Sequence, residues 1–176
     1  FIYAIGNRYW YSHSSVLCDA LRREGVMTPV NMRILYHTPK EGIIGDCFRC
    51  CIASLLDLYA DQVPHFCDYD WKDTSGRWFT DLNKWLAPRG LSYIEMPVAD
   101  GGSDSVAKWL SAVIPFGFDA YHILGGKSPR GFDHAVVARN GAIIHDPHPS
   151  RAGLVGPQSD GAYMLGLLVY RSTVGG

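Results

Sequence analysis

Hydrophobic residues in the first half of the chain recur at helical spacing. Apolar side chains at positions 48, 51, 52, 55, 56 and 58 predict a helix through CFRCCIASLLDLY, with Asp46 as its N-cap. A second helix is predicted over 78–87, where APRG ends it, and its apolar face comprises Trp78, Phe79, Leu82, Trp85 and Leu86. A third helix is expected in VAKWLSAVI, which Pro115 stops.

Strand-like runs dominate the second half of the chain. LSYIEMPV, AYHILGG, HAVVAR, AIIHD and AYMLGLLVYRS each read as a strand, and residues 28–37 contain a further strand candidate. Helices early in the chain and an antiparallel run late in it indicate an α+β domain. In that arrangement the cysteine-bearing helix packs on a C-terminal sheet.

Length and charge limit the classes of protein to consider. A chain of 176 residues is long enough for one domain, and 47% hydrophobic content indicates a globular one. A formal net charge of −1 gives no field that would attract nucleic acid or an anionic membrane. No apolar run has the length of a membrane span and no secretion signal is recognisable, so a cytoplasmic protein with free thiols is expected.

Residues 1–26 are set apart from the expected domain of residues 27–176, because Met27 would serve as an alternative start. The segment FIYAIGNRYWY is too apolar for a free tail. It packs on the domain, occupies its cleft or contacts another chain, and the sequence does not choose among these. Because the other predicted elements follow Met27, a chain lacking residues 1–26 is expected to fold.

Three of the five cysteines fall within five positions, in GDCFRCCIASLL. The spacing of Cys47, Cys50 and Cys51 does not suit a disulfide framework. A zinc site needs four ligands, and beyond Cys47 and Cys50 the chain offers only scattered candidates, so no metal or other cofactor is expected. These candidates are His65, Cys67, His145 and His148. Cys50 and Cys51 are interpreted as core residues, because cysteine is often buried and position 51 lies on the apolar face of the helix.

Cys47 differs from the other two because it is expected in the first turn of the helix, directly after Gly45 and Asp46. Unpaired backbone N–H groups and the helix dipole stabilise a thiolate there, and the thiolate is the nucleophile. The same N–H groups can hold a developing oxyanion. By position alone, a nucleophile and a buried thiol beside a tight turn are equally good interpretations.

A base and an orienting carboxylate are available in GFDHAVVARNGAIIHDPHP. HAVVAR and AIIHD are expected to form a hairpin, with His134 opening the first strand and Asp146 closing the second. A three-residue loop of Arg139, Asn140 and Gly141 would pair His134 with Asp146 and place Gly141 at positive φ. Both side chains would then lie on one face, where His134 can activate a cysteine. His122, His145 and His148 are competing bases with poorer carboxylate geometry.

This order of residues resembles the papain-like cysteine peptidase superfamily, and most closely its bacterial and phage branch that includes the double-glycine leader peptidases. GDCFRCCIASLL resembles the D-C-x-x-A segment of that branch, and HAVVARNGAIIHDP resembles its H-x-V-V and D-P segments. The resemblance covers roughly residues 28–172. It implies that Cys47 is the nucleophile, that His134 is the general base and then acid, and that Asp146 orients His134.

One position departs from the family pattern. The family usually has a glutamine six residues before the cysteine as an oxyanion donor, and here that position is Glu41. His37 and the Cys47 backbone N–H are the other oxyanion candidates. Gly45, Asp46, Trp71, Trp78 and Asp133 are candidates for a substrate groove.

The sequence therefore predicts a papain-like thiol hydrolase that cleaves a peptide or other amide bond in a peptide or protein substrate through a cysteine thioester. Two alternatives stay open. One is an acyltransferase or deamidase that uses the same triad. The other is a non-catalytic phage or bacterial binding protein with a relic triad, and the reactivity of Cys47 would separate it from an enzyme.

Overall fold

A computed structural model of the chain describes residues 27–35, 38, 43–68, 75–99, 108 and 120–171. The segment 1–26 and the candidate residues His37, Glu41 and Trp71 lie outside this range. The same holds for the helix expected in VAKWLSAVI, of which only Lys108 is described, in a helical state.

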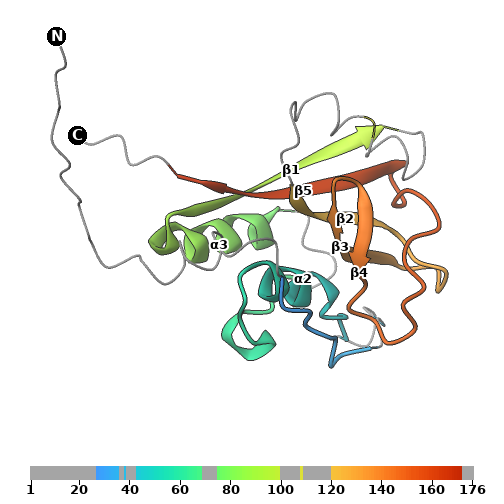
Figure 1. Cartoon of the computed structure of the whole chain (residues 1–176), viewed down its shortest axis with the longest axis horizontal. Coiled ribbons are helices and arrows are strands. Elements are labelled where there is room, and N and C mark those ends of the chain that lie inside the picture. The colour runs from blue at the N-terminus through green and yellow to red at the C-terminus, as the bar shows by residue number, and fades with distance from the viewer. Residues whose placement is uncertain are drawn as a thin grey trace, which may run out of the picture.

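The described residues form an α+β arrangement of two helices and a five-stranded antiparallel sheet, as the sequence predicts. Helices α2 (Cys47–Leu55) and α3 (Arg77–Leu86) are followed by the 3-10 turns η2 (Ala60–Gln62) and η3 (Ala87–Arg89). The strands are β1 (Leu91–Ala99), β2 (Tyr121–Lys127), β3 (Asp133–Arg139), β4 (Ala142–His145) and β5 (Ala162–Tyr170). Their order in the sheet is β1-β5-β2-β3-β4 (Figure 1).

Two expectations about the first part of the chain are wrong. Residues 28–35 form no strand, and Thr38 makes only an isolated bridge with Ile43. Their backbone is held partly by side chains instead, for example by Ser54 Oγ, which accepts a hydrogen bond from the Val30 N–H. Helix α2 ends at Leu55 rather than near Tyr59, because Asp57 adopts a left-handed conformation with φ 52°.

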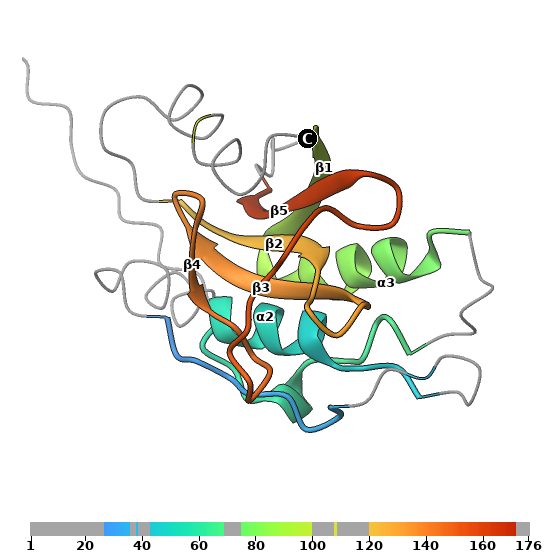
Figure 2. The same ribbon diagram turned by 90° about the vertical axis from the view of Figure 1, so that its right-hand side faces the viewer.

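Both helices cover the same face of the sheet (Figures 1 and 2). The alternation of side chains along each strand separates two apolar clusters. The cluster beneath the helices joins Ile52 and Leu56 to strand residues such as Ile123 and Val137. The cluster on the other face contains Val98, Leu124, Val136, Ala138, Tyr163 and Leu165. The start of α2 is thereby held against β3, the strand that carries His134.

Candidate active site

Cys47 is the first residue of α2, as predicted, and its side chain is half-buried. A backbone N–H at this position has no acceptor within its own helix, and the positive end of the helix dipole lies beside it. Two cavities meet at Cys47, and both are also lined by Gly45, Asp133 and His134. A substrate that occupies either cavity would therefore pass directly beside the thiol.

The N-cap prediction for Asp46 holds for its position but is wrong for its side chain. The carboxylate makes no capping hydrogen bond. It is buried and accepts hydrogen bonds from the backbone N–H groups of Arg33 and Ile34, at 3.3 and 3.1 Å. Asp46 therefore ties the preceding segment to the start of the helix. It lines neither cavity, unlike the other groove candidates Gly45, Trp78 and Asp133.

His134 and Asp146 lie side by side, as predicted, with 2.8 Å between His134 Nε2 and Asp146 Oδ1. His134 is the second residue of β3, Asp146 follows the last residue of β4, and both are buried. The bond to Asp146 uses Nε2, so Nδ1 is the ring nitrogen that is left for the hydrogen bond between His134 and the Cys47 thiol. Cysteine, histidine and carboxylate are thus connected in one chain of hydrogen bonds.

The loop length and the register of the β3–β4 hairpin differ from those expected. Arg139 pairs with Ala142, so the loop has the two residues Asn140 and Gly141, with φ 51° and 85°, instead of three. A bulge then shifts the register between Ala138 and Val137, which pairs with His145. Continued by one residue, this register places Asp146 opposite Val136, on the face that carries His134. The bulge supplies the change of parity that the sequence analysis assigned to the loop.

Asp146 is held as an ionised acceptor. Besides His134, its carboxylate accepts hydrogen bonds from the backbone N–H groups of His148 and Gly153, each at 2.8 Å. Burial by itself raises the pKa of Asp146, but these three hydrogen bonds and the charge of His134 outweigh it and lower the pKa to about 2. The carboxylate therefore stays charged over the whole range in which histidine titrates.

The pKa of His134 is shifted in the opposite direction to that of Asp146. Burial lowers the pKa of His134, but hydrogen bonds to Asp146 and Cys47 and the charges of both raise it to about 9. An imidazolium between a carboxylate and a thiol is thus the favoured state at neutral pH. A cationic imidazole is the form of a histidine base that can pair with a cysteine thiolate.

The three competing histidines have other roles. His122 is fully buried and pairs in register with Ala138, and its Nδ1–H donates a hydrogen bond to the Ala120 carbonyl. Both ring nitrogens of His145 are engaged, by the Val30 carbonyl at 2.9 Å and by Arg151 at 2.9 Å. His148 lines one of the cavities, and its Nδ1 bonds to Ser150. Arg151 also donates to the Asp146 carbonyl, which fixes the chain after β4.

Cys50 and Cys51 are core residues, as predicted, and both are fully buried. Burial raises the pKa of the Cys50 thiol to about 12 and that of Cys51 well above its ordinary value. Cys67 is half-buried and lines one cavity, and burial raises its pKa to about 12 as well. Within the part of the chain that the structure describes, no three His, Cys, Asp or Glu side chains gather as metal ligands.

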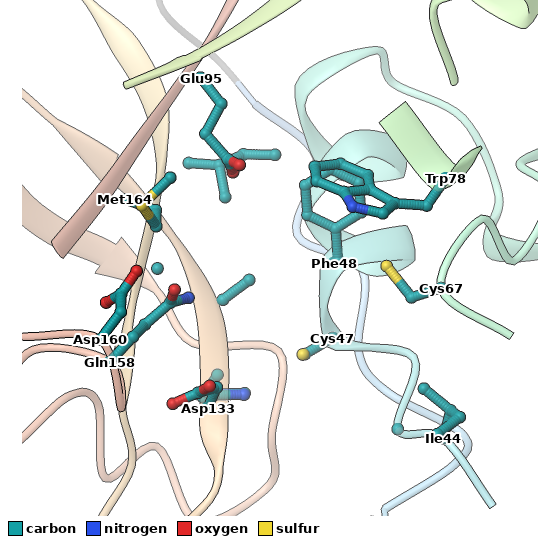
Figure 3. A pocket seen from close by; sticks show the side chains of 15 residues that line it. Ile44, Cys47, Phe48, Cys67, Trp78, Glu95, Asp133, Gln158, Asp160 and Met164 are labelled. Carbon is teal, nitrogen blue, oxygen red and sulfur yellow. The ribbon is translucent and has the colours of Figure 1, made fainter. Parts of the chain in front are cut away.

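The first cavity has a volume of about 270 Å³ and lies between the sheet and the two helices. In Figure 3 the Phe48, Trp78 and Cys67 side chains form one wall, opposite Glu95, Gln158, Asp160 and Met164. We call it the Glu95 cavity. The second, of about 550 Å³, is lined by residues that include Met32, Leu35, Arg130 and Phe132, and we call it the Arg130 cavity.

Three residues that line the Glu95 cavity were not predicted from the sequence: Glu95, Gln158 and Asp160. A signal for Glu95 was present, because it continues the alternation of Leu91 and Tyr93, whose side chains face the helices. A charged residue at such an inward position is unusual. Gln158 and Asp160 lie in the connection between β4 and β5, where the sequence has no periodicity from which their direction can be predicted.

Comparison with protein-family models, curated proteins and solved structures finds no match for this chain. None of the helices in the described residues combines the length and the apolar character needed to cross a bilayer.

Proposed function

We propose that this protein is a papain-like thiol hydrolase that cleaves a peptide or other amide bond through a Cys47 thioester. The observation that carries the proposal is the buried His134–Asp146 pair, 2.8 Å apart, hydrogen-bonded to a half-buried thiol at a helix N-terminus. A binding surface gains nothing from a charged carboxylate and imidazole held in the interior beside a thiol, whereas nucleophilic catalysis requires that arrangement.

The reaction follows from the positions of the three groups. Cys47 Sγ attacks the substrate carbonyl carbon, and the thiol proton resides on His134. The carbonyl oxygen becomes an oxyanion that the Cys47 backbone N–H can stabilise. His134 then gives its proton to the leaving amine as the carbon–nitrogen bond breaks, which leaves a thioester on Cys47. Water, deprotonated by His134, attacks the thioester and releases the acid and the free thiol.

Asp146 acts through His134. Its carboxylate accepts from His134 Nε2, which orients Nδ1 toward the thiol and stabilises the imidazolium during both proton transfers. The hydrogen bonds from His148 and Gly153 keep this carboxylate from turning away. The connection after β4 therefore belongs to the catalytic machinery even though it touches no substrate.

The test is hydrolysis of a library of fluorogenic peptide amides by the wild-type protein and by two matched variants. We expect Cys47→Ala to abolish turnover and Cys50→Ala to retain it, because of these two thiols only Cys47 lines the cavities and contacts His134. Intact mass measurement of rapidly quenched wild-type protein should show the acyl group of the substrate on Cys47. Turnover that survives Cys47→Ala, or a complete absence of hydrolysis and acylation across the library, would overturn the proposal.

A further inference from the structure

The Glu95 cavity opens at the nucleophile and ends at a carboxylate. Cys47 and His134 line one part of it, and Glu95 lines another, with the aromatic wall of Phe48 and Trp78 between the helices and the sheet (Figure 3). The Phe48 and Trp78 rings pack edge to face, with centroids 5.4 Å apart. A substrate side chain that enters from the thiol would therefore run along an apolar wall before it meets Glu95.

Glu95 is held in place by its own strand. The Tyr93 hydroxyl donates a hydrogen bond of 2.9 Å to Glu95 Oε1. Tyr93 itself fits only because residue 166 is glycine, since a Cβ at Gly166 would overlap the Tyr93 hydroxyl. The carboxylate is half-buried, and burial raises the pKa of Glu95, so its charge is poorly solvated where it stands. A ligand that carries a positive charge would supply the stabilisation that water does not.

Two further carboxylates line this cavity, together with the cationic ring of His134. They belong to Asp133 and Asp160, and no lysine or arginine is among the lining residues that the structure describes. No lysine or arginine in the described part of the chain forms an ion pair with any of these three carboxylates. The Arg130 cavity on the other side of Cys47 shares Asp133 but also contains Arg130. The two sides of Cys47 therefore differ in charge, because Arg130 offsets the shared carboxylate in one cavity and Glu95 and Asp160 add to it in the other.

We propose that the Glu95 cavity selects substrates with a long, cationic side chain, lysine or arginine, next to the scissile bond, and that Glu95 is the specificity-determining residue. The methylene stem would pack on Phe48, Ile123 and Met164, and the cation would lie near Trp78 and Glu95, an environment that attracts it by charge and by the aromatic face. This inference rests on the proposed hydrolase function, because it assigns a substrate class to the same site.

The test uses fluorogenic peptides that differ in a single residue, placed at either of the two positions before the scissile bond. Lysine, arginine, norleucine and glutamate are compared, since norleucine has the length of lysine without its charge. We expect kcat/KM to be at least about 10-fold higher for lysine or arginine than for norleucine, and lowest for glutamate. Glu95→Gln should reduce the preference for lysine about 10-fold while kcat/KM for norleucine stays within about 2-fold. Asp61→Asn, an exposed acidic position on η2, is the matched control and should change neither value.

A second measurement does not depend on turnover. Nα-acetyl-lysine methylamide should slow alkylation of Cys47 by iodoacetamide in the wild-type protein but not in Glu95→Gln, and the norleucine analogue should have little effect in either. Turnover without a preference for cationic residues, or a preference that Glu95→Gln leaves unchanged, would overturn the inference and leave the hydrolase proposal standing. Protection by the lysine analogue without hydrolysis of any peptide would overturn the hydrolase proposal and keep the cation site.

Discussion

Cys47 and Cys50 occupy successive turns of α2, and the same side chain meets different surroundings at the two places. Cys47 lies at the open end of the helix, in contact with both cavities and hydrogen-bonded to His134. Cys50 is fully buried, and its Sγ lies 3.5 Å from the Asn31 carbonyl. Burial suppresses the thiolate of Cys50 by raising its pKa to about 12. One helical turn thus separates a thiol that lines the two cavities from one that packs in the core, and each prediction below challenges that distinction.

The largest expected difference is in reactivity toward iodoacetamide. At pH 7 a thiol with a pKa of about 12 is ionised in only about one molecule in 10⁵, and Cys50 is also closed to solvent. We therefore expect Cys47 to be carbamidomethylated at least about 10³-fold faster than Cys50, Cys51 or Cys67, as measured by peptide mass spectrometry over time. Cys50 labelling at a similar rate, in protein that circular dichroism shows to be folded, would remove the distinction.

The next effect concerns the carboxylate that orients the base. Asp146→Ala should lower kcat by about 10²–10⁴ with a smaller change in KM, because His134 would lose the partner that fixes its ring and stabilises its charge. The labelling rate of Cys47 should fall as well, and it should then lie closer to the labelling rates of the buried thiols. Asp160→Asn is the control, because Asp160 lines the Glu95 cavity together with His134 but makes no hydrogen bond to His134 or Asp146 among those that the structure gives. A normal kcat in Asp146→Ala would show that His134 needs no orienting carboxylate.

Some of the structural features behind these two predictions could be predicted from the sequence, and others could not. The helix at Cys47, the hairpin of β3 and β4 and the contact between His134 and Asp146 follow from periodicity, Asn140-Gly141 and the position of each polar residue at the end of a strand. The bulge that completes the contact does not, because Ile143 and Ile144 are both apolar and both exposed, so the pattern contains no signal for the extra residue. The buried position of Asp46 was equally inaccessible, since its partners are backbone N–H groups thirteen and twelve residues earlier.

A third prediction concerns stability as a function of pH. The lowered pKa of Asp146 contributes stability above the unfolded-state value near 3.8, and this contribution is lost as the pH falls toward 2. The raised pKa of His134 contributes stability below its unfolded-state value near 6.5, and this is lost as the pH rises through about 9. The pair should therefore stabilise the fold most between about pH 4 and 6.5, on the order of 2 kcal/mol.

Urea unfolding from pH 2 to 10 measures this dependence. In Asp146→Asn the free energy of unfolding should vary less across both limbs, because the charge that raises the His134 pKa is gone. Curves of unfolding free energy against pH that run parallel for wild type and variant over the whole range would show that the His134–Asp146 pair is not ionised in the folded protein. In that case no charged imidazole would lie beside Cys47, and its electrostatic surroundings would not differ in this respect from those of Cys50.

The smallest expected effect reverses the order of the thiols. Cys51→Ala should reduce the free energy of unfolding by about 1 kcal/mol, because it leaves a small void among Ile52, Leu56 and the sheet. Cys47→Ala should change it by less than about 0.5 kcal/mol, since that side chain is half-buried and faces the cavities. Chemical denaturation of the two variants at pH 6 compares them directly. A larger loss for Cys47→Ala would mean that the fold, rather than catalysis, requires this thiol.

The bulge in the β3–β4 hairpin makes the site depend on a count of residues as well as on their identity. Because side chains alternate along a strand, one residue inserted beside Ile143 and Ile144 would turn Asp146 to the other face of the sheet, although Cys47, His134 and Asp146 would all still be encoded. Removing one of the two isoleucines would instead delete the bulge and leave Asp146 opposite Val136. Exposed apolar positions usually tolerate exchange, so these two should accept many side chains but no added residue. Substitutions in this short edge strand should therefore be tolerated, whereas a single-codon insertion there would separate Asp146 from His134.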